Sequence, residues 1–302
     1  MNCENCGNIF IARRATARYC SDRCRVYAKR GVQVVDNPMI KQTAKEIEQM
    51  PDKTPKKITS KLAKAGFSVK SGLDIKPIEF VTSGVPEIDD LVGGIPKGRI
   101  TEIYGMQGVG KTTLMTMCVS NMSKTNKVLY IDAENAFNPH RALELGLDLK
   151  NIEVSDTYIV EDVIDLTIEA VDSYDIVVID SLASLVPRAE DDGNTGDMFM
   201  GLKARLMGQF MRKLVGKLGR SDCAAVFINQ LRETMEIYGP KKSTPGGHAL
   251  PYAASLRLEL STTKADRIRD KDGGFKGHKV TVEVTKSKVS RPHQKTQFKI
   301  DY

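Results

Sequence analysis

The sequence predicts an α/β fold in which helices flank a mostly parallel sheet. Short, nearly continuous apolar segments occur at 99–104, 127–132, 174–180 and 225–229, as is typical of strands that are buried on both faces. From Pro77 onward these segments alternate with stretches suited to helices. A glycine-rich loop also separates the first of these strands from the helix expected after it.

That loop, GMQGVGKTT, matches the pattern G-x-x-x-x-G-K-[ST] and precedes an apolar segment, 114–119, that is predicted to begin a buried helix. In such loops, glycines let backbone N–H groups approach a nucleotide's phosphates, and the helix dipole adds to the attraction. We expect Lys111 to neutralise charge on the β- and γ-phosphates and the Thr112 hydroxyl to hold Mg²⁺. A glycine-rich turn with a chance lysine is the alternative. The predicted contacts are Gly105, Met106, Gln107, Gly108, Val109, Gly110, Lys111, Thr112 and Thr113.

Polar residues stand at the ends of the three later strands. Asp180 ends an apolar strand, and beside such a phosphate loop an aspartate at this point holds Mg²⁺. Glu134 follows strand 127–132, and ligands of open α/β sheets bind beyond the carboxyl ends of strands. We therefore expect Glu134 to orient or deprotonate an attacking water, although it could be an ordinary solvated acid. Gln230 is an amide at a third strand end and is expected to sense a γ-phosphate.

Two polar loops follow, at 190–197 and 231–247. The first is short and is predicted to be flexible. The second is long and combines basic with aromatic residues, which is typical of contacts to single-stranded nucleic acid. A disordered surface excursion is the alternative. The candidate DNA-binding residues are Arg232, Tyr238, Lys241, Lys242, Gly246 and Gly247.

Four of the six cysteines form two close pairs near the N-terminus. Zinc prefers four thiolates in a tetrahedron, and a segment this short needs a metal to supply its folding energy. We therefore predict a zinc ribbon over residues 1–30, with a disulfide pair as the competing arrangement. Basic residues and two tyrosines surround the pairs, which fits phosphate contacts or docking on a protein equally well. The predicted ligands are Cys3, Cys6, Cys20 and Cys24, and the predicted core thiols are Cys118 and Cys223.

Positive charge is concentrated in the N-terminal quarter of the chain, whose total net charge is +7. Residues 1–70 contain 15 Lys and Arg against 6 Asp and Glu, whereas the remainder contains 30 against 32. This imbalance indicates a polyanionic partner, with a lysine-rich extension that only aids solubility as the alternative. We expect residues 31–75 to form a basic helical linker or an oligomerisation arm, and residues 76–302 to form the α/β core.

Hydrophobic residues make up 41% of the chain, which is ample for a core, yet no apolar run approaches the length of a membrane span. The N-terminus is polar and rich in cysteine, unlike a signal peptide. We therefore expect a cytoplasmic protein with no membrane partner.

The order of these motifs resembles that of the bacterial RecA recombinases from Glu79 to Tyr302. The resemblance implies that residues 76–302 form a RecA-like P-loop ATPase core with a mostly parallel sheet. It is carried by the phosphate loop and by eight further segments, 83–84, 98–105, 131–139, 178–187, 200–207, 227–232, 246–250 and 284–289.

This resemblance implies an ATP-dependent DNA recombinase that forms helical filaments on single-stranded DNA and promotes pairing and strand exchange with double-stranded DNA. It implies ATP and Mg²⁺ as cofactors, Glu134 as the catalytic glutamate and Gln230 as the nucleotide-sensing amide. Two alternatives are a motor on branched DNA, similar to the RadA repair ATPases, and a nucleotide-binding module that docks on replication proteins. The RadA proteins also carry a four-cysteine ribbon before a RecA core.

Lys286 and Lys288 match the family's pair of lysines that reaches the ATP of a neighbouring subunit in the filament. Alternate residues of a strand share a face, so we expect the two ammonium groups to lie side by side. Two adjacent cations favour the arrival of an anion between or beside them. The alternative is a solvated strand edge protected by lysines.

The chain departs from the family at three places. Arg141 stands where the family stacks a tyrosine on adenine, and Asn138 replaces a nearby aspartate. Tyr302 matches the family's second base-contacting tyrosine, so Arg141 and Tyr302 are expected to contact the base of ATP. We also expect no equivalent of the family's C-terminal lobe, which binds duplex DNA.

Overall fold

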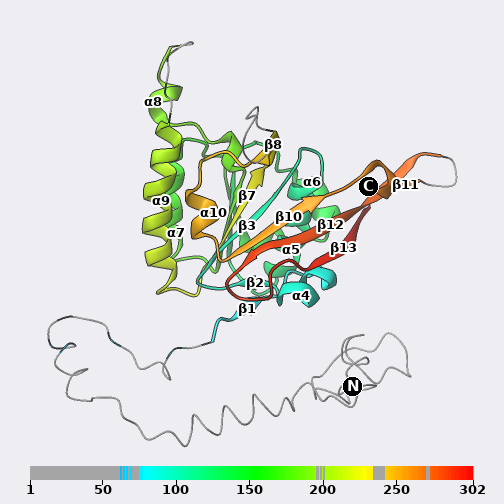
Figure 1. The fold of residues 1–302 in the computed structure, drawn as a ribbon, viewed down its shortest axis with the longest axis horizontal. Helices are drawn as coiled ribbons and strands as arrows, with labels where there is room; N and C mark the ends of the chain where they lie inside the picture. The colour runs from blue at the N-terminus through cyan, green and yellow to red at the C-terminus, as the bar shows by residue number, and fades with distance from the viewer. Residues whose placement is uncertain are drawn as a thin grey trace, which may run out of the picture. The chain divides into compact units, whose positions relative to one another are not determined.

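A sheet packed between two groups of helices organises the computed structural model (Figure 1). The structure describes residues 77–194, 197, 199, 201–233, 242–269 and 273–301, together with positions 62, 64, 66, 69 and 75. The predicted ribbon over 1–30 and most of the predicted arm over 31–75 lie outside these residues. Seven predicted site residues also lie outside them: Cys3, Cys6, Cys20, Cys24, Tyr238, Lys241 and Tyr302.

Within the described part of the chain, nine strands form one sheet in the order β11–β12–β10–β3–β7–β6–β4–β5, and β13 pairs with β12. The pairs from β10 to β5 are parallel, whereas β12 pairs antiparallel with β10, β11 and β13. The prediction of a mostly parallel sheet is confirmed. The strands are β3 (Ile100–Gly105), β4 (Val128–Asp132), β5 (Ile152–Ser155), β6 (Ile176–Asp180), β7 (Ala224–Gln230), β10 (Leu256–Ser261), β11 (Arg267–Arg269), β12 (Phe275–Ser287) and β13 (Lys295–Asp301).

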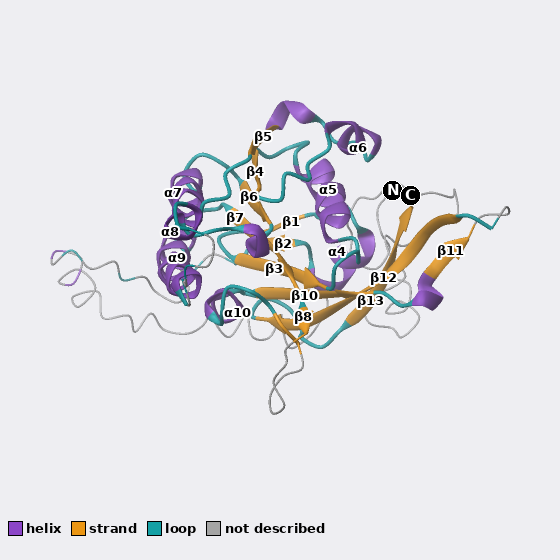
Figure 2. Ribbon diagram, turned by 90° about the horizontal axis from the view of Figure 1, so that it is seen from above, coloured by secondary structure: helices purple, strands orange, loops and turns teal. Residues whose placement is uncertain are grey.

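Helices cover both faces of this sheet, as Figure 2 shows. One face packs against α4 and α5, and the other packs against α7, α9 and α10. Because both faces are covered, the central strands β4 and β6 are buried along their whole length. These helices are α4 (Pro86–Val92), α5 (Lys111–Met122), α7 (Val160–Ala170), α9 (Leu202–Leu218) and α10 (Ala249–Ala253).

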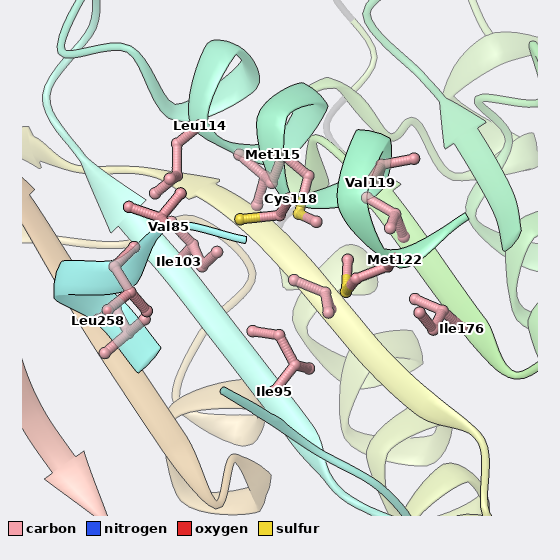
Figure 3. Packing of buried hydrophobic residues seen from close by; sticks show 14 of the residues in the cluster. Val85, Ile95, Ile103, Leu114, Met115, Cys118, Val119, Met122, Ile176 and Leu258 are labelled. Carbon is pink, nitrogen blue, oxygen red and sulfur yellow. The ribbon is translucent and has the colours of Figure 1, made fainter. Parts of the chain in front are cut away.

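Helix α5 is the centre of the first hydrophobic layer. Figure 3 shows Met115, Cys118 and Met122 of α5 among strand residues that include Ile103 and Ile176. The buried helix predicted after the phosphate loop is therefore confirmed. Cys118 is a free, buried thiol, and Cys223 is likewise free and buried in the second layer, as predicted.

The two segments that were predicted to be loops contain short helices and strands. The helix α8 (Arg188–Asp191) includes the first residues of the loop at 190–197, so that loop is not irregular throughout. The strands β8 (Arg232–Glu233) and β9 (Lys242–Ser243) pair antiparallel at the base of the loop at 231–247. The other short elements are β1 (Phe80–Val81), β2 (Ile95–Pro96), α6 (Pro139–Glu144) and the 3-10 turns η2 (Leu149–Asn151), η3 (Leu182–Ser184) and η4 (Lys264–Asp266). Among the described residues, no helix combines the length and apolar character that crossing a membrane requires.

A largely buried ion pair joins β3 to β10, the parallel strand that borders the antiparallel part of the sheet. The side chain of Glu102, in β3, is fully buried, and the Nε of Arg257, in β10, donates to its Oε2 at 2.5 Å. The Asn229 amide donates to the other carboxylate oxygen at 3.1 Å. The Arg257 guanidinium also lies 4.5 Å from the centre of the Tyr104 ring. Because a buried charge without a paired charge and hydrogen bonds strongly destabilises the fold, the pair constrains how β3 and β10 align.

We expect Arg257→Met to lower the free energy of unfolding by about 3 kcal/mol, because it leaves a buried carboxylate without its cation. Urea unfolding measures this loss. The control is Lys295→Met, which removes an exposed ammonium that pairs with Glu283 at 2.7 Å. That loss should stay below about 1 kcal/mol. Equal losses in both variants would show that the burial of Glu102 does not matter.

Candidate functional site

The polar ends of four parallel strands meet at one edge of the sheet. In the pairing register, Gly105 of β3 stands beside Gln230 of β7, and Asp132 of β4 stands beside Asp180 of β6. Strands β6 and β7 are themselves neighbours. Residues that follow these strands therefore gather at the same edge, where open α/β sheets bind their ligands.

The phosphate loop needs glycine at two points. Gly110 has a φ of +95°, and a Cβ atom there would lie 2.4 Å from the Cδ1 of Ile300. A Cβ atom on Gly105 would lie 2.4 Å from the carbonyl oxygen of Leu260. Helix α5 starts directly after Gly110, at Lys111, so its first N–H groups lack partners within the helix. Such a turn at a helix N-terminus suits a phosphate group.

A cavity of about 300 Å³ opens beside this loop. Its wall brings together nine predicted site residues, Gln107, Gly108, Gly110, Lys111, Thr112, Thr113, Glu134, Asp180 and Gln230. Two residues from the antiparallel strands, His278 and Ile300, complete the wall. The side chain of Val109, which was also predicted to contact a nucleotide, is buried in the hydrophobic core.

Lys111 is nearly buried, with 8% of its surface exposed. Its ammonium group donates to the carbonyl oxygens of Gly105 at 3.1 Å and Met106 at 3.0 Å. Burial lowers the pKa of Lys111, while the carboxylates of Glu134 and Asp180 oppose that shift. An ammonium held by neutral carbonyls in its own loop can exchange them for an anionic phosphate at little cost.

Glu134 is held at the cavity wall by three donors. The amide of Gln230 donates to its Oε1 at 2.9 Å, and the Ser184 hydroxyl donates to the same oxygen at 3.2 Å. The Ser181 hydroxyl also donates to this oxygen. The structure thus joins the two residues that were predicted to activate water and to sense phosphate.

Asp180 is 1% exposed, and its two carboxylate oxygens differ in their hydrogen bonds. Oδ2 accepts hydrogen bonds from the hydroxyl groups of Tyr130 at 2.7 Å and Thr112 at 2.9 Å. Oδ1 is buried and has no hydrogen-bond partner among the described residues. Burial raises the pKa of Asp180 to about 6, although the two hydroxyl donors oppose the rise. An unpartnered carboxylate oxygen beside a threonine hydroxyl fits a divalent cation such as Mg²⁺.

Arg141, which was predicted to contact the base of ATP, lies near the end of β13. Asn138 caps α6, since its Oδ1 accepts from two backbone N–H groups of that helix at 3.0 and 3.2 Å. The Arg141 guanidinium donates to Glu144 at 2.9 Å and to the Asp301 carbonyl at 3.1 Å. Arg141 therefore ties α6 to β13, outside the wall of the cavity just described.

The two predicted interface lysines lie away from that cavity. Lys286 is in β12, and its ammonium donates to the carbonyl oxygens of Pro251 at 2.6 Å and Tyr252 at 2.9 Å, at the end of α10. Lys288 is exposed and follows the last residue of β12 by one position. Burial lowers the pKa of Lys286, and the nearby charge of Lys288 lowers it further.

The loop at 231–247 starts from the cavity wall. Its first residue follows Gln230, and Arg232 is exposed in β8. Lys242 is in β9, and Gly246 and Gly247 lie between β9 and α10. The Asn229 amide donates to the Pro245 carbonyl at 3.3 Å, which anchors the returning end of the loop to β7.

Sequence reasoning missed Ser181, Ser184, Tyr130 and His278. Ser181 and Ser184 carry a weak signal, because they lie within four residues of the end of the strand that finishes in Asp180. Tyr130 reads as an ordinary apolar strand residue. His278 is 5% exposed, and its Nε2 lies 3.4 Å from the Val109 carbonyl oxygen. Its strand pairs antiparallel at the far side of the sheet, and no local pattern places it beside the loop.

An open α/β sheet with a phosphate loop at the carboxyl edge of its strands defines a P-loop protein of the nucleotide-binding class. Residues 51–302 match the model of the RecA N-terminal domain family. The chain belongs to the RecA family.

Three relatives are each named Protein RecA. The protein from Clostridium tetani is 43% identical over 235 residues, which cover 76% of this chain and 66% of the relative. The protein from Arthrospira platensis is 41% identical over 229 residues, which cover 74% of this chain and 62% of the relative. The protein from Trichodesmium erythraeum is 40% identical over 232 residues, with the same two coverages. The chain thus spans slightly less than two thirds of the length of these relatives.

We expect Asp180→Asn to raise the free energy of unfolding of the nucleotide-free protein by about 2 kcal/mol at pH 7.5. The pKa of Asp180 in the folded protein, about 6, exceeds its ordinary value of 3.8, so folding disfavours the ionised form. The gain should shrink as the pH falls from 6 to 4, where the parental carboxyl becomes protonated. Denaturant unfolding at several pH values measures it.

The matched control is Asp165→Asn, which removes an exposed carboxylate of α7. That change should alter stability by less than about 0.5 kcal/mol at every pH. A gain for Asp180→Asn that is the same at pH 4 and pH 7.5 would contradict the assigned burial cost.

Proposed function

We propose that the chain is an ATP-dependent DNA recombinase that forms filaments on single-stranded DNA and pairs it with homologous double-stranded DNA. The observation that carries this proposal is the contact between Glu134 and Gln230 in the wall of a phosphate-loop cavity. It joins a residue suited to activating water with one that directly precedes the loop at 231–247. Membership in the RecA family supports the same function.

ATP and Mg²⁺ fit the residues of the cavity. Lys111 would release its two loop carbonyls and bind the β- and γ-phosphates. Thr112 and Asp180 would hold Mg²⁺, which would supply neutralising charge at the phosphates. Glu134 would accept a hydrogen bond from the attacking water and orient it toward the γ-phosphate. Arg141 and Tyr302 would contact the base, and the remaining residues of the loop would contribute N–H donors.

Gln230 supports a link between nucleotide and DNA. Its side chain contacts Glu134, and its backbone leads into β8 and the loop that carries Arg232. A γ-phosphate that attracts the amide would draw it away from Glu134 and move the start of this loop. Tyr238, Lys241 and Lys242, with Gly246 and Gly247, would complete the DNA contacts.

Lys286 and Lys288 would act on the nucleotide of a neighbouring subunit. Both lie away from the cavity of their own chain, and mutual repulsion disfavours leaving two ammonium groups together without an anion. In a filament, the γ-phosphate of the next subunit would supply that anion. The lysines would stabilise the charge that develops on it.

The N-terminal region would serve a partner in the cytoplasm. A zinc ion held by Cys3, Cys6, Cys20 and Cys24 would fold the ribbon over residues 1–30. The excess positive charge of this quarter favours DNA as its target, and a replication or repair protein is the second candidate. Residues 31–75 would connect the ribbon to the core.

The function is tested by measuring ATP turnover with and without single-stranded DNA, alongside a strand-exchange assay. We expect DNA to stimulate turnover and strand exchange to require ATP. Glu134→Gln should bind ATP normally and lose at least 100-fold in turnover, because general-base groups contribute that much. Turnover on branched DNA without strand exchange would indicate a DNA motor instead. An oligomer without DNA and with negligible turnover would indicate a docking module.

A mixing experiment tests the lysine pair. The double variant Lys286→Ala, Lys288→Ala should bind ATP and DNA but turn over poorly by itself. Mixed with Glu134→Gln chains, it should regain activity, because an intact site then meets intact lysines at some interfaces. Normal turnover by the lysine variant, or no recovery at any mixing ratio, would refute action between subunits.

Elemental analysis tests the ribbon. Protein purified under reducing conditions without chelator should contain one zinc ion per chain, and Cys20→Ser should lose it. Cys118→Ser removes a buried core thiol and should keep the metal, which makes it the matched control. Zinc-free parental protein would exclude the ribbon.

A further inference from the structure

The hydroxyl group of Tyr130 reaches from one strand to the acidic end of its neighbour. Tyr130 is 1% exposed in β4, where the register pairs it with Val178 of β6. Its hydroxyl donates to Asp180, two residues further along β6, at 2.7 Å. A tyrosine hydroxyl carries its proton at neutral pH, so it acts as a hydrogen-bond donor to the carboxylate.

The Tyr130 hydroxyl bonds to only one of the two carboxylate oxygens of Asp180, Oδ2. The Thr112 hydroxyl donates to the same oxygen, Oδ2, at 2.9 Å. The other oxygen, Oδ1, is buried and makes no hydrogen bond with the described residues. Two donors on a single oxygen fix the rotation of the carboxyl group and leave its other oxygen for a ligand.

Packing alone does not require the Tyr130 hydroxyl. The aromatic ring lies in the first hydrophobic layer, and its centre is 5.5 Å from that of Phe137. A phenylalanine would fill the same volume and keep this ring contact. The hydroxyl therefore places a polar group in an apolar layer, where its partner is Asp180.

We propose that Tyr130 is a positioning residue for the divalent cation, because its hydroxyl holds Asp180 by Oδ2 and so presents Oδ1 to the cation or to a water bound to it. This inference rests on the proposed nucleotide site. Hydrogen bonds that orient a metal-binding group commonly change metal affinity by about 10- to 100-fold when they are removed. Thr112 would still hold Oδ2 in a Tyr130 variant, so we expect the lower end of that range.

The test uses the full chain with Tyr130→Phe and the matched variant Tyr104→Phe. The Tyr104 hydroxyl is also largely buried in a parallel strand and donates to Thr285 at 2.9 Å and to Glu259 at 3.2 Å, away from the cavity. Both substitutions remove one hydroxyl and nothing else. The measurement is the affinity for a fluorescent ADP analogue, first in EDTA and then across a MgCl₂ titration, so no turnover is needed.

We expect Tyr130→Phe to raise the Mg²⁺ concentration for half-maximal tightening of nucleotide binding about tenfold, while its affinity in EDTA stays parental. Tyr104→Phe should match the parental chain in both conditions. A parental Mg²⁺ dependence in Tyr130→Phe would overturn the proposal. An equal loss of nucleotide affinity with and without Mg²⁺ would also overturn it, since the hydroxyl would then affect nucleotide binding independently of the cation. If the parental chain binds no nucleotide at all, the proposed function itself fails first.

Discussion

The placement of ionisable carboxylates at the edge of a buried sheet is the constraint on which the candidate site depends. Asp180 loses almost all contact with water, and ionisation is disfavoured unless hydrogen-bond donors or cations compensate. Donors arrive from β4 and from the first turn of α5, and the Lys111 ammonium contributes charge. Compensation is incomplete, because the pKa of Asp180 stays near 6. Additional positive charge would therefore stabilise the ionised carboxylate, and a cation bound to a nucleotide would supply it.

The antiparallel strands contribute more than additional sheet. His278 of β12 and Ile300 of β13 complete the wall of the cavity and lie against the phosphate loop. The Glu102–Arg257 pair fixes β10 against β3, and β10 in turn carries β12. Residues separated by almost two hundred positions therefore define one cavity. Its shape depends on long-range pairing as much as on the loop sequence.

The features that could be predicted from the sequence are those with a local signal. The apolar runs that end in Asp132, Asp180 and Gln230 each became a parallel strand, because continuous burial favours that pattern. The loop from Gly105 to Thr113 followed from its glycine spacing. The Tyr130 hydroxyl bond could not be predicted, since it depends on which strands are neighbours. The same holds for the wall formed by β12 and β13, whose residues show no pattern directed at a nucleotide.

The contacts of Lys286 have a consequence for a subunit on its own. Its ammonium already satisfies two carbonyl oxygens at the end of α10, so serving a neighbour's nucleotide, as proposed, requires it to leave them. On this proposal, a lone chain would hold the Lys286 ammonium in an internal contact. Withdrawal becomes favourable only where another molecule offers a stronger negative charge. Such an arrangement would restrain wasteful consumption of ATP by unassembled protein and reserve it for chains that have joined.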